Sequence, residues 1–194
     1  ANSLKDKPLF WSKKEGFWEG VTWSDAAVQI KKLASVLQSY GVKKGDRVLI
    51  ASENRPEWAI SDLAVMSLGA IVVPAYTSNT EEDNNYLLTH SQAKLAITSG
   101  GNVASRLCLA ADSNKFIKNI ILIDADPRNF TVKGCKLLSW NEEIKKVDID
   151  SKFEKSIEKL SDEDVCCFIY TSGTGGRPKG VMLSHKSCLL YTSD

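Results

Sequence analysis

Residues 170–180 carry the side chains with the clearest chemical potential in this chain of 194 residues. They read Y-T-S-G-T-G-G-R-P-K-G and contain four glycines, four hydroxyl side chains and a lysine that follows a proline. Glycine lets backbone N–H groups approach a ligand without a Cβ in the way. Successive N–H groups in such a loop form a concave anion site, to which hydroxyl and ammonium groups add donors. The segment therefore predicts a loop that binds a polyphosphate.

Two common phosphate loops do not fit this spacing. A Walker A loop requires a lysine followed by Ser or Thr at the start of a helix. Here Lys179 is followed by Gly180 and by residues 181–183, which are typical of a strand. The dinucleotide fingerprint G-x-G-x-x-G also fails, because its last glycine would fall on Pro178. The loop therefore belongs to a different class of phosphate-binding segment.

The segment resembles the signature loop of the AMP-forming adenylating enzymes, a superfamily of acyl-CoA synthetases, luciferases and peptide-synthetase adenylation domains. The usual pattern of that loop is T-S-G-T-T-G-x-P-K-G, followed by V-x-x-[ST]-H. The matching positions are Thr171, Ser172, Gly173, Thr174, Gly176, Pro178, Lys179, Gly180, Val181, Ser184 and His185. Gly175 departs from the pattern, which has a second threonine or another small polar residue there. We interpret Gly175 as a tolerated variant, since it loses a hydroxyl donor but keeps the backbone N–H.

The resemblance extends upstream of the loop and covers residues from about 9 to 185. Three segments look like the first half of an acyl-CoA synthetase, in the right order: G-V-K-K-G-D-R-V at 41–48, N-R-P-E-W at 54–58 and G-A-I-V-V-P at 69–74. Together with the aromatic residues at 10–18, the N-R-P-E-W segment is most similar to long-chain and very-long-chain fatty acid members. The chain is thus identified as similar to a long-chain fatty acid–CoA ligase.

The elements that must position this loop alternate along the chain. Residues 8–21 alternate aromatic and polar side chains around Lys14-Glu15-Gly16, which predicts a β-hairpin. Strands are expected at 47–51, 70–73, 94–98, 119–123, 165–170 and 181–183. Helices are expected at 22–41, 56–69, 80–89 and 103–111, after Ser139 and, as a short helix with a linker, at 148–161. Alternating strands and helices predict an α/β fold: a doubly wound, largely parallel sheet flanked by helices, with ligands at the strand ends.

Three local expectations accompany these elements. Thr22 and Thr80 should cap helices, and Ser139 with Glu142 forms a capping-box pattern before a charged helix. The helix that begins at Pro56 should bury Trp58, Leu63 and Met66. The strand at 70–73 should end at Pro74, because proline lacks the N–H that a sheet requires.

Composition narrows the possible partners. The chain has 43% hydrophobic and 25% charged residues and a formal net charge of +1, so there is no electrostatic case for a nucleic-acid partner. No run reaches the roughly 18 apolar residues of a transmembrane segment. Five cysteines without metal-site spacing suit free thiols in a reducing compartment. We expect a cytoplasmic location, with peripheral association at the membrane compatible with a fatty substrate.

The resemblance implies a two-step, AMP-forming ligase that uses ATP, Mg²⁺ and coenzyme A. A fatty carboxylate attacks the α-phosphorus of ATP to give acyl-AMP and pyrophosphate, and the CoA thiol then displaces AMP. Lys179 is the candidate catalytic residue, because such displacements depend on positioning and charge neutralisation. No metal ligand is assigned. The candidate residues for the ATP phosphates are Thr171, Ser172, Gly173, Thr174, Gly175, Gly176 and Lys179.

The two histidines receive different interpretations. His90, near the end of an expected helix, is interpreted as structural, where imidazole tolerates the negative helix dipole. His185 ends the expected strand after the loop and matches a family position. The resemblance implies that it orients the loop or helps to shape the acyl tunnel.

The resemblance also implies that residues 1–194 are a partial AMP-binding (adenylation) domain, an N-terminal fragment. In the family, the adenine, ribose and metal ligands and a mobile C-terminal domain lie downstream. We therefore expect the activity to belong to the parent protein and the fragment alone to be inactive. Two alternatives stay open: an adenylating enzyme that passes the acyl group to a carrier protein or another acceptor, and a non-catalytic nucleotide-binding half-domain.

Overall fold

The computed structural model describes residues 4–150, 153, 157–171 and 176–189. It begins with the expected hairpin, in which β1 (Pro8–Lys14) pairs antiparallel with β2 (Phe17–Thr22). The turn between them uses positive φ angles, 49° at Glu15 and 91° at Gly16. Such angles suit a tight hairpin turn, and glycine adopts them without strain.

The remaining described strands form one sheet with the order β7-β6-β5-β3-β4-β8-β9. All neighbouring pairs are parallel except β8 and β9, which are antiparallel. The predicted doubly wound, largely parallel sheet is therefore confirmed. The strands are β3 (Arg47–Ala51), β4 (Ile71–Ala75), β5 (Leu95–Thr98), β6 (Asn119–Leu122), β7 (Lys136–Ser139), β8 (Val165–Thr171) and β9 (Lys179–Ser184).

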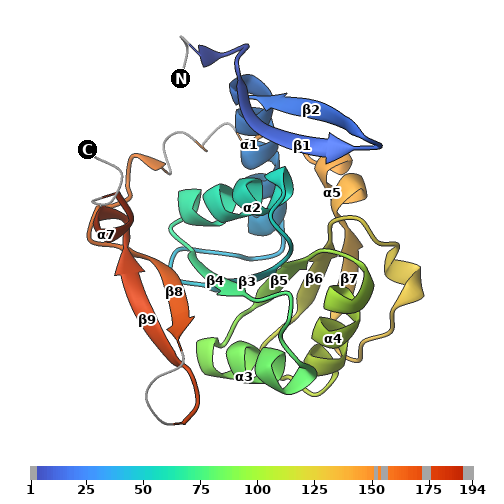
Figure 1. Cartoon of the computed structure of the whole chain (residues 1–194). Coiled ribbons are helices and arrows are strands. Elements are labelled where there is room, and N and C mark those ends of the chain that lie inside the picture. Colours follow the sequence, from blue (N-terminus) through green and yellow to red (C-terminus); the bar gives the residue numbers. More distant parts are fainter. Residues whose placement is uncertain (1–3, 151–152, 154–156, 172–175, 190–194) are drawn as a thin grey trace.

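Helices cover both faces of this sheet. In Figure 1, α1 and α2 lie above the central strands and α3 and α4 lie below them, with α5 beside α1. Among the described residues, no helix is long and apolar enough to cross a membrane. The bounds are α1 (Trp23–Ser39), α2 (Pro56–Ser67), α3 (Glu81–Ser91), α4 (Gly101–Asp112), α5 (Trp140–Lys146), α7 (His185–Leu189) and a short 3₁₀ helix, η2 (Pro127–Asn129).

The sheet separates two hydrophobic cores. On β3, Val48 and Ile50 belong to the core under α1 and α2, while Leu49 and Ala51 belong to the core over α3 and α4. This alternation follows from the period of two in a strand. Each fully buried Val, Leu or Ile contributes roughly 1.5–3 kcal/mol relative to an exposed one.

Local side-chain chemistry sets the helix starts as expected. The Thr22 hydroxyl accepts a hydrogen bond from the Asp25 N–H at 3.1 Å and begins α1. Thr80 and Asp83 form a reciprocal capping box at α3, with the Thr80 N–H donating to the Asp83 carboxylate at 2.9 Å. The Ser139 hydroxyl accepts from the Glu142 N–H and begins α5. The three predicted helix starts are confirmed, and of the three caps only Thr80–Asp83 forms the reciprocal capping box.

Three expectations need correction. Leu63 is 41% exposed, because the inward side of α2 consists of Ile60, Ala64 and Val65, whereas Trp58 and Met66 do pack against the core. Residues 136–139 form a strand, β7, that the sequence analysis did not include.

Strand β4 also continues through Pro74 to Ala75 instead of ending there. The Ile71 N–H donates to Asp46 O at 2.8 Å on the β3 side, so the N–H positions of residues 72 and 74 face β8. The described pairing of β4 with β8 is confined to Val72 and Cys167. The sheet therefore accommodates a residue without an N–H at position 74.

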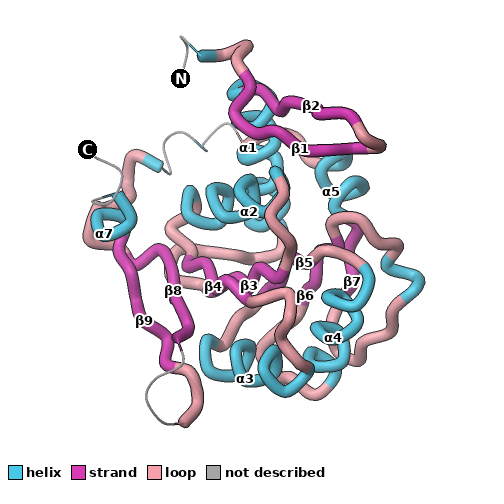
Figure 2. The backbone as a smooth tube through the Cα atoms, viewed as in Figure 1, coloured by secondary structure: helices cyan, strands magenta, loops and turns pink. Residues whose placement is uncertain are grey.

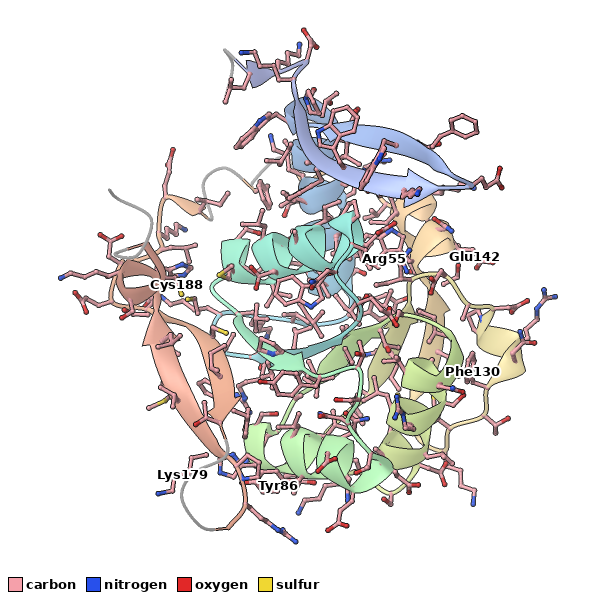
Figure 3. The ribbon with its side chains drawn as sticks, in the orientation of Figure 1. Arg55, Tyr86, Phe130, Glu142, Lys179 and Cys188 are labelled. Atoms are coloured by element: carbon pink, nitrogen blue, oxygen red, sulfur yellow. The ribbon has the colours of Figure 1, made fainter. Side chains whose placement is uncertain are left out.

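Arg55, from the N-R-P-E-W segment, ties together the loops at the carboxyl edge of the sheet (Figure 3). Its guanidinium contacts Glu57 at 2.9 Å and Asp124 at 2.5 Å. Asp124 also accepts a hydrogen bond from the Gly100 N–H at 2.6 Å. These residues follow β3, β5 and β6, close to the point where the chain changes direction across the sheet. The N-R-P-E-W segment therefore links the loops that follow β3, β5 and β6.

Arg55→Ala should lower the free energy of unfolding by about 1.5–3 kcal/mol at pH 7, because it removes charge-assisted hydrogen bonds. Partial burial acts to raise the pKa of Asp124, but hydrogen bonds from Arg55 and the Gly100 N–H hold it below its usual range. This stabilisation is present above the unfolded Asp pKa of about 4 and is lost as pH falls through the lower folded pKa. The wild-type advantage in urea unfolding should therefore shrink between pH 7 and pH 3.

Arg128→Ala is the matched control. Arg128 also contacts a carboxylate, that of Asp126 at 2.5 Å, but its side chain is 89% exposed. Exposed pairs of this kind contribute little to stability. Equal destabilisation by the two substitutions would contradict the role given to Arg55.

Candidate functional site

The predicted phosphate loop joins β8 to β9 at the end of an antiparallel hairpin (Figure 2). Thr171 and Lys179 are direct partners across this hairpin and are its last pair before the loop. Cross-strand partners place their side chains on the same face, with Cβ atoms about 4.5–5.5 Å apart. The structure thus brings two of the predicted residues together. Of the others, Gly176 is described, while Ser172, Gly173, Thr174 and Gly175 lie outside the described residues.

The described part of the loop is cationic and open. Lys179 and Arg177 are exposed, and no carboxylate of the described residues forms an ion pair with either. Gly176 adopts φ 111°, and a Cβ at that position would meet no atom within 4 Å. The backbone there is accessible, and its conformation favours glycine. An approaching polyanion would therefore meet two exposed cationic side chains, neither of which is in an ion pair with a described carboxylate.

Gly180 packs closely against its cross-strand partner, Tyr170. A Cβ on Gly180 would lie 3.1 Å from Cζ of the Tyr170 ring. Tyr170 is 8% exposed, and burial, followed by the nearby Tyr86, raises its pKa to about 12. Tyr170 is consequently neutral at physiological pH and can take part in neutral hydrogen bonds.

Helix α3 contacts the residues on both sides of the loop. The His90 Nδ1 lies 2.8 Å from the Tyr170 hydroxyl, and the Tyr86 hydroxyl donates to the Pro178 carbonyl at 2.6 Å. Figure 3 shows Tyr86 beside the loop end of the hairpin, on the same side of the molecule as Lys179. Sequence reasoning missed Tyr86 and related His90 to the helix dipole. Their i, i+4 spacing was the available signal, because it places both side chains on one face of a helix.

Two cavities open beside the hairpin at the carboxyl edge of the sheet. One of about 350 Å³ lies between the loop and α3, and its lining includes Asp83, Tyr86 and Thr171. The other, of about 500 Å³, is lined in part by Glu53, Trp58 and Ile169. Pro74, Tyr76 and Tyr170 line both cavities. The loop thus stands next to space in which a ligand larger than phosphate could lie.

His185 lies at the other end of the hairpin. It is the first residue of α7 instead of the last residue of the strand, and its N–H donates to Asp164 O at 3.1 Å. The pairing Val165–Ser184 lies next to it, at the end of the hairpin away from Thr171. At about 3.3 Å per residue, five or six residues of strand separate His185 from the loop by roughly 17–20 Å. Its Nε2 is buried and has no hydrogen-bond partner among the described residues.

The five thiols are free in this structure, as the sequence analysis expected. The sulfur atoms of Cys166 and Cys188 lie 3.6 Å apart, close to the base of the hairpin. Burial, followed by the hydrogen bond with Cys188, raises the pKa of Cys166 to about 12. This thiol is therefore protonated at neutral pH.

The fold and its loop define a class of protein. The structure of a luciferase-like enzyme from the nonluminescent mealworm Zophobas morio superposes with a TM-score of 0.75 at 20% identity, over 88% of this chain and 38% of that one. The anthranilate CoA ligase AuaEII in complex with anthranoyl-AMP gives 0.71 at 24% identity, over 87% and 30%. These likenesses show that the chain shares the fold of these two enzymes.

Residues 1–193 match the model of one protein family, described as AMP-binding enzyme, and the chain belongs to that family. Its curated relatives include fatty acyl-CoA synthetase A of Dictyostelium discoideum, 33% identical over 95% of this chain. Long-chain-fatty-acid–CoA ligase FadD15 of Mycobacterium tuberculosis is 33% identical over 89% of it. The chain spans about 28% of the length of either relative.

Gly180→Ala should destabilise the hairpin, with a loss of about 1–3 kcal/mol in unfolding free energy, because overpacking forces a clamped ring to move. The hydrogen bond between Tyr170 and His90 resists that movement. Chemical unfolding followed by tryptophan fluorescence would measure the loss. A variant as stable as the wild type would mean that the Tyr170 ring has room to shift.

Proposed function

We propose that the complete protein activates a long-chain fatty acid with ATP, forms acyl-AMP, and transfers the acyl group to coenzyme A. The observation that carries this proposal is the cationic hairpin loop, with Lys179 opposite Thr171 and no described carboxylate paired to it. The names of the curated relatives support the fatty acid and the CoA acceptor. Residues 1–194 would then be part of an adenylation domain.

The residues of the loop fit a polyphosphate. The hydroxyls of Thr171, Ser172 and Thr174, the amides of the three glycines 173, 175 and 176, and the Lys179 ammonium would hold the β- and γ-phosphates. Pyrophosphate leaves when the fatty carboxylate attacks the α-phosphorus, so the loop would bind the group on which charge develops. Donors that are already in place at such a position lower the barrier without reorganisation.

Mg²⁺ belongs to the same proposal and would supply further charge compensation on the phosphates. No group of three or more metal-ligating side chains occurs among the described residues, so we assign it no ligand in this chain. We also propose a cytoplasmic location with peripheral contact at membranes. Five free thiols support a reducing compartment, and long-chain fatty acids partition into lipid.

Lys179→Ala in the complete protein should impair adenylation far more than thioester formation. Removing one preorganised donor to a developing charge typically costs about 10²–10³ in rate. Fatty-acid-dependent exchange of pyrophosphate into ATP should fall by that factor, whereas conversion of supplied acyl-AMP with CoA should stay within about 5-fold of the wild type. The two half-reactions are measured separately for this purpose.

Lys186→Ala is the control for the loss of a lysine near the hairpin. Lys186 is exposed on α7 and pairs with Glu163 at 3.1 Å. Its removal should leave both half-reactions unchanged.

Equal losses in both half-reactions for Lys179→Ala would show that Lys179 does not serve the leaving pyrophosphate. Transfer to a carrier protein but not to CoA would overturn the proposed acceptor.

Gly175→Thr restores the residue that the signature pattern usually has and should be tolerated, with only a modest change in the KM for ATP. Threonine adds a hydroxyl donor but disfavours positive φ. Pyrophosphate exchange at varied ATP concentration measures both the activity of the variant and its KM for ATP. Complete loss of activity would show that Gly175 has a backbone conformation that threonine cannot adopt.

A further inference from the structure

We propose that Tyr86 and His90 are positioning residues that hold the two ends of the phosphate loop on helix α3. The inference rests on the proposed function, in which the loop binds the ATP phosphates. It assigns to α3, about 80 residues upstream of the loop, the task of fixing where Lys179 stands. Neither residue lies in the signature motif.

The two contacts reach opposite ends of the loop. On the incoming side, His90 Nδ1 lies 2.8 Å from the hydroxyl of Tyr170, the residue before Thr171. On the outgoing side, the Tyr86 hydroxyl donates at 2.6 Å to the carbonyl of Pro178, the residue before Lys179. Helix α3 therefore restrains both ends of the loop, at Tyr170 and at Pro178.

Aromatic packing joins these contacts into one cluster. The rings of Tyr86 and Tyr170 meet nearly at right angles, with centroids 6.2 Å apart, and the ring of His90 meets that of Tyr170 at 5.6 Å. Edge-to-face pairs at these distances are favourable. The guanidinium of Arg177 lies over the Tyr86 ring, 5.4 Å from its centroid. Arg177, which lies on the outgoing side of the loop as Pro178 does, is thus also held by α3.

Helix α3 is itself firmly held, which a positioning role requires. Its first turn is closed by the Thr80–Asp83 capping box, and Leu87 and Leu88 are buried beneath it. Beyond α4, Asn114 donates to the side chains of Asn85 and Thr89 at 3.3 and 2.9 Å. A loop that is anchored to such a platform spends more time in one arrangement. When only a fraction of molecules is competent to bind, the apparent affinity is the intrinsic affinity multiplied by that fraction.

The test uses the complete enzyme and pyrophosphate exchange at varied ATP. Tyr86→Phe keeps the ring and its stacking but removes the donor to Pro178, and should raise the KM for ATP about 3- to 10-fold, the usual worth of one hydrogen bond. His90→Leu should raise it similarly, while His90→Asn, whose amide can replace Nδ1, should restore it to within about 2-fold. The KM for the fatty acid and the acyl-AMP-to-CoA step should not change.

Tyr40→Phe is the matched control. Its hydroxyl also donates across the fold, to Glu143 at 2.8 Å, but on the opposite face of the sheet. It should lower thermal stability as Tyr86→Phe does, without moving the KM for ATP. A KM shift as large in Tyr40→Phe as in Tyr86→Phe, or equal KM values for His90→Asn and His90→Leu, would overturn the positioning role.

Lys179→Ala, measured in the same assay, separates this inference from the proposed function. If Lys179→Ala leaves exchange at the wild-type rate, the phosphate-binding function of the loop is wrong. If Lys179→Ala lowers exchange by about 10²–10³ but Tyr86→Phe and His90→Leu leave the KM for ATP unchanged, the function stands and the positioning role is wrong.

Discussion

Burial of β3 on both faces is the constraint on which the rest of this structure depends. Val48, Leu49 and Ile50 are completely buried, although successive side chains point in opposite directions. A parallel strand of this kind needs helices on each side of the sheet. Each connection must then return the chain to the same starting edge, so the carboxyl ends of the parallel strands gather at one edge. The loop after β8 lies there, where doubly wound sheets bind ligands.

Features that depend on neighbouring residues could be predicted from the sequence. Thr22 and Thr80 cap helices because each has an aspartate three residues later, and the capping contact is complete within one turn. The loop motif was equally local, and it nominated Thr171 and Lys179, which are cross-strand partners in the structure; their contact with phosphate stays a prediction. In both helix caps the interacting atoms lie three residues apart, so the sequence specifies them without help from tertiary contacts.

Features that depend on distant parts of the chain could not be predicted in this way. Helix α2 is apolar around most of its circumference, so periodicity did not show that Leu63 faces outward. Pro74 can stay in a strand only because of where β8 pairs with β4. The contacts of Tyr86 and His90 with the loop span 80 residues or more. Only the topology of the sheet brings α3 beside the loop end of the hairpin.

The late arrival of β8 has a consequence for synthesis on the ribosome. About ninety residues separate the end of β4 at Ala75 from the start of β8 at Val165. At roughly 5–20 residues per second, β4 waits some 5–20 s for its outer neighbour. During that interval its free edge could pair with another nascent chain. Pro74, whose missing N–H faces that edge, interrupts the row of donors and so discourages the wrong partner until the correct strand emerges.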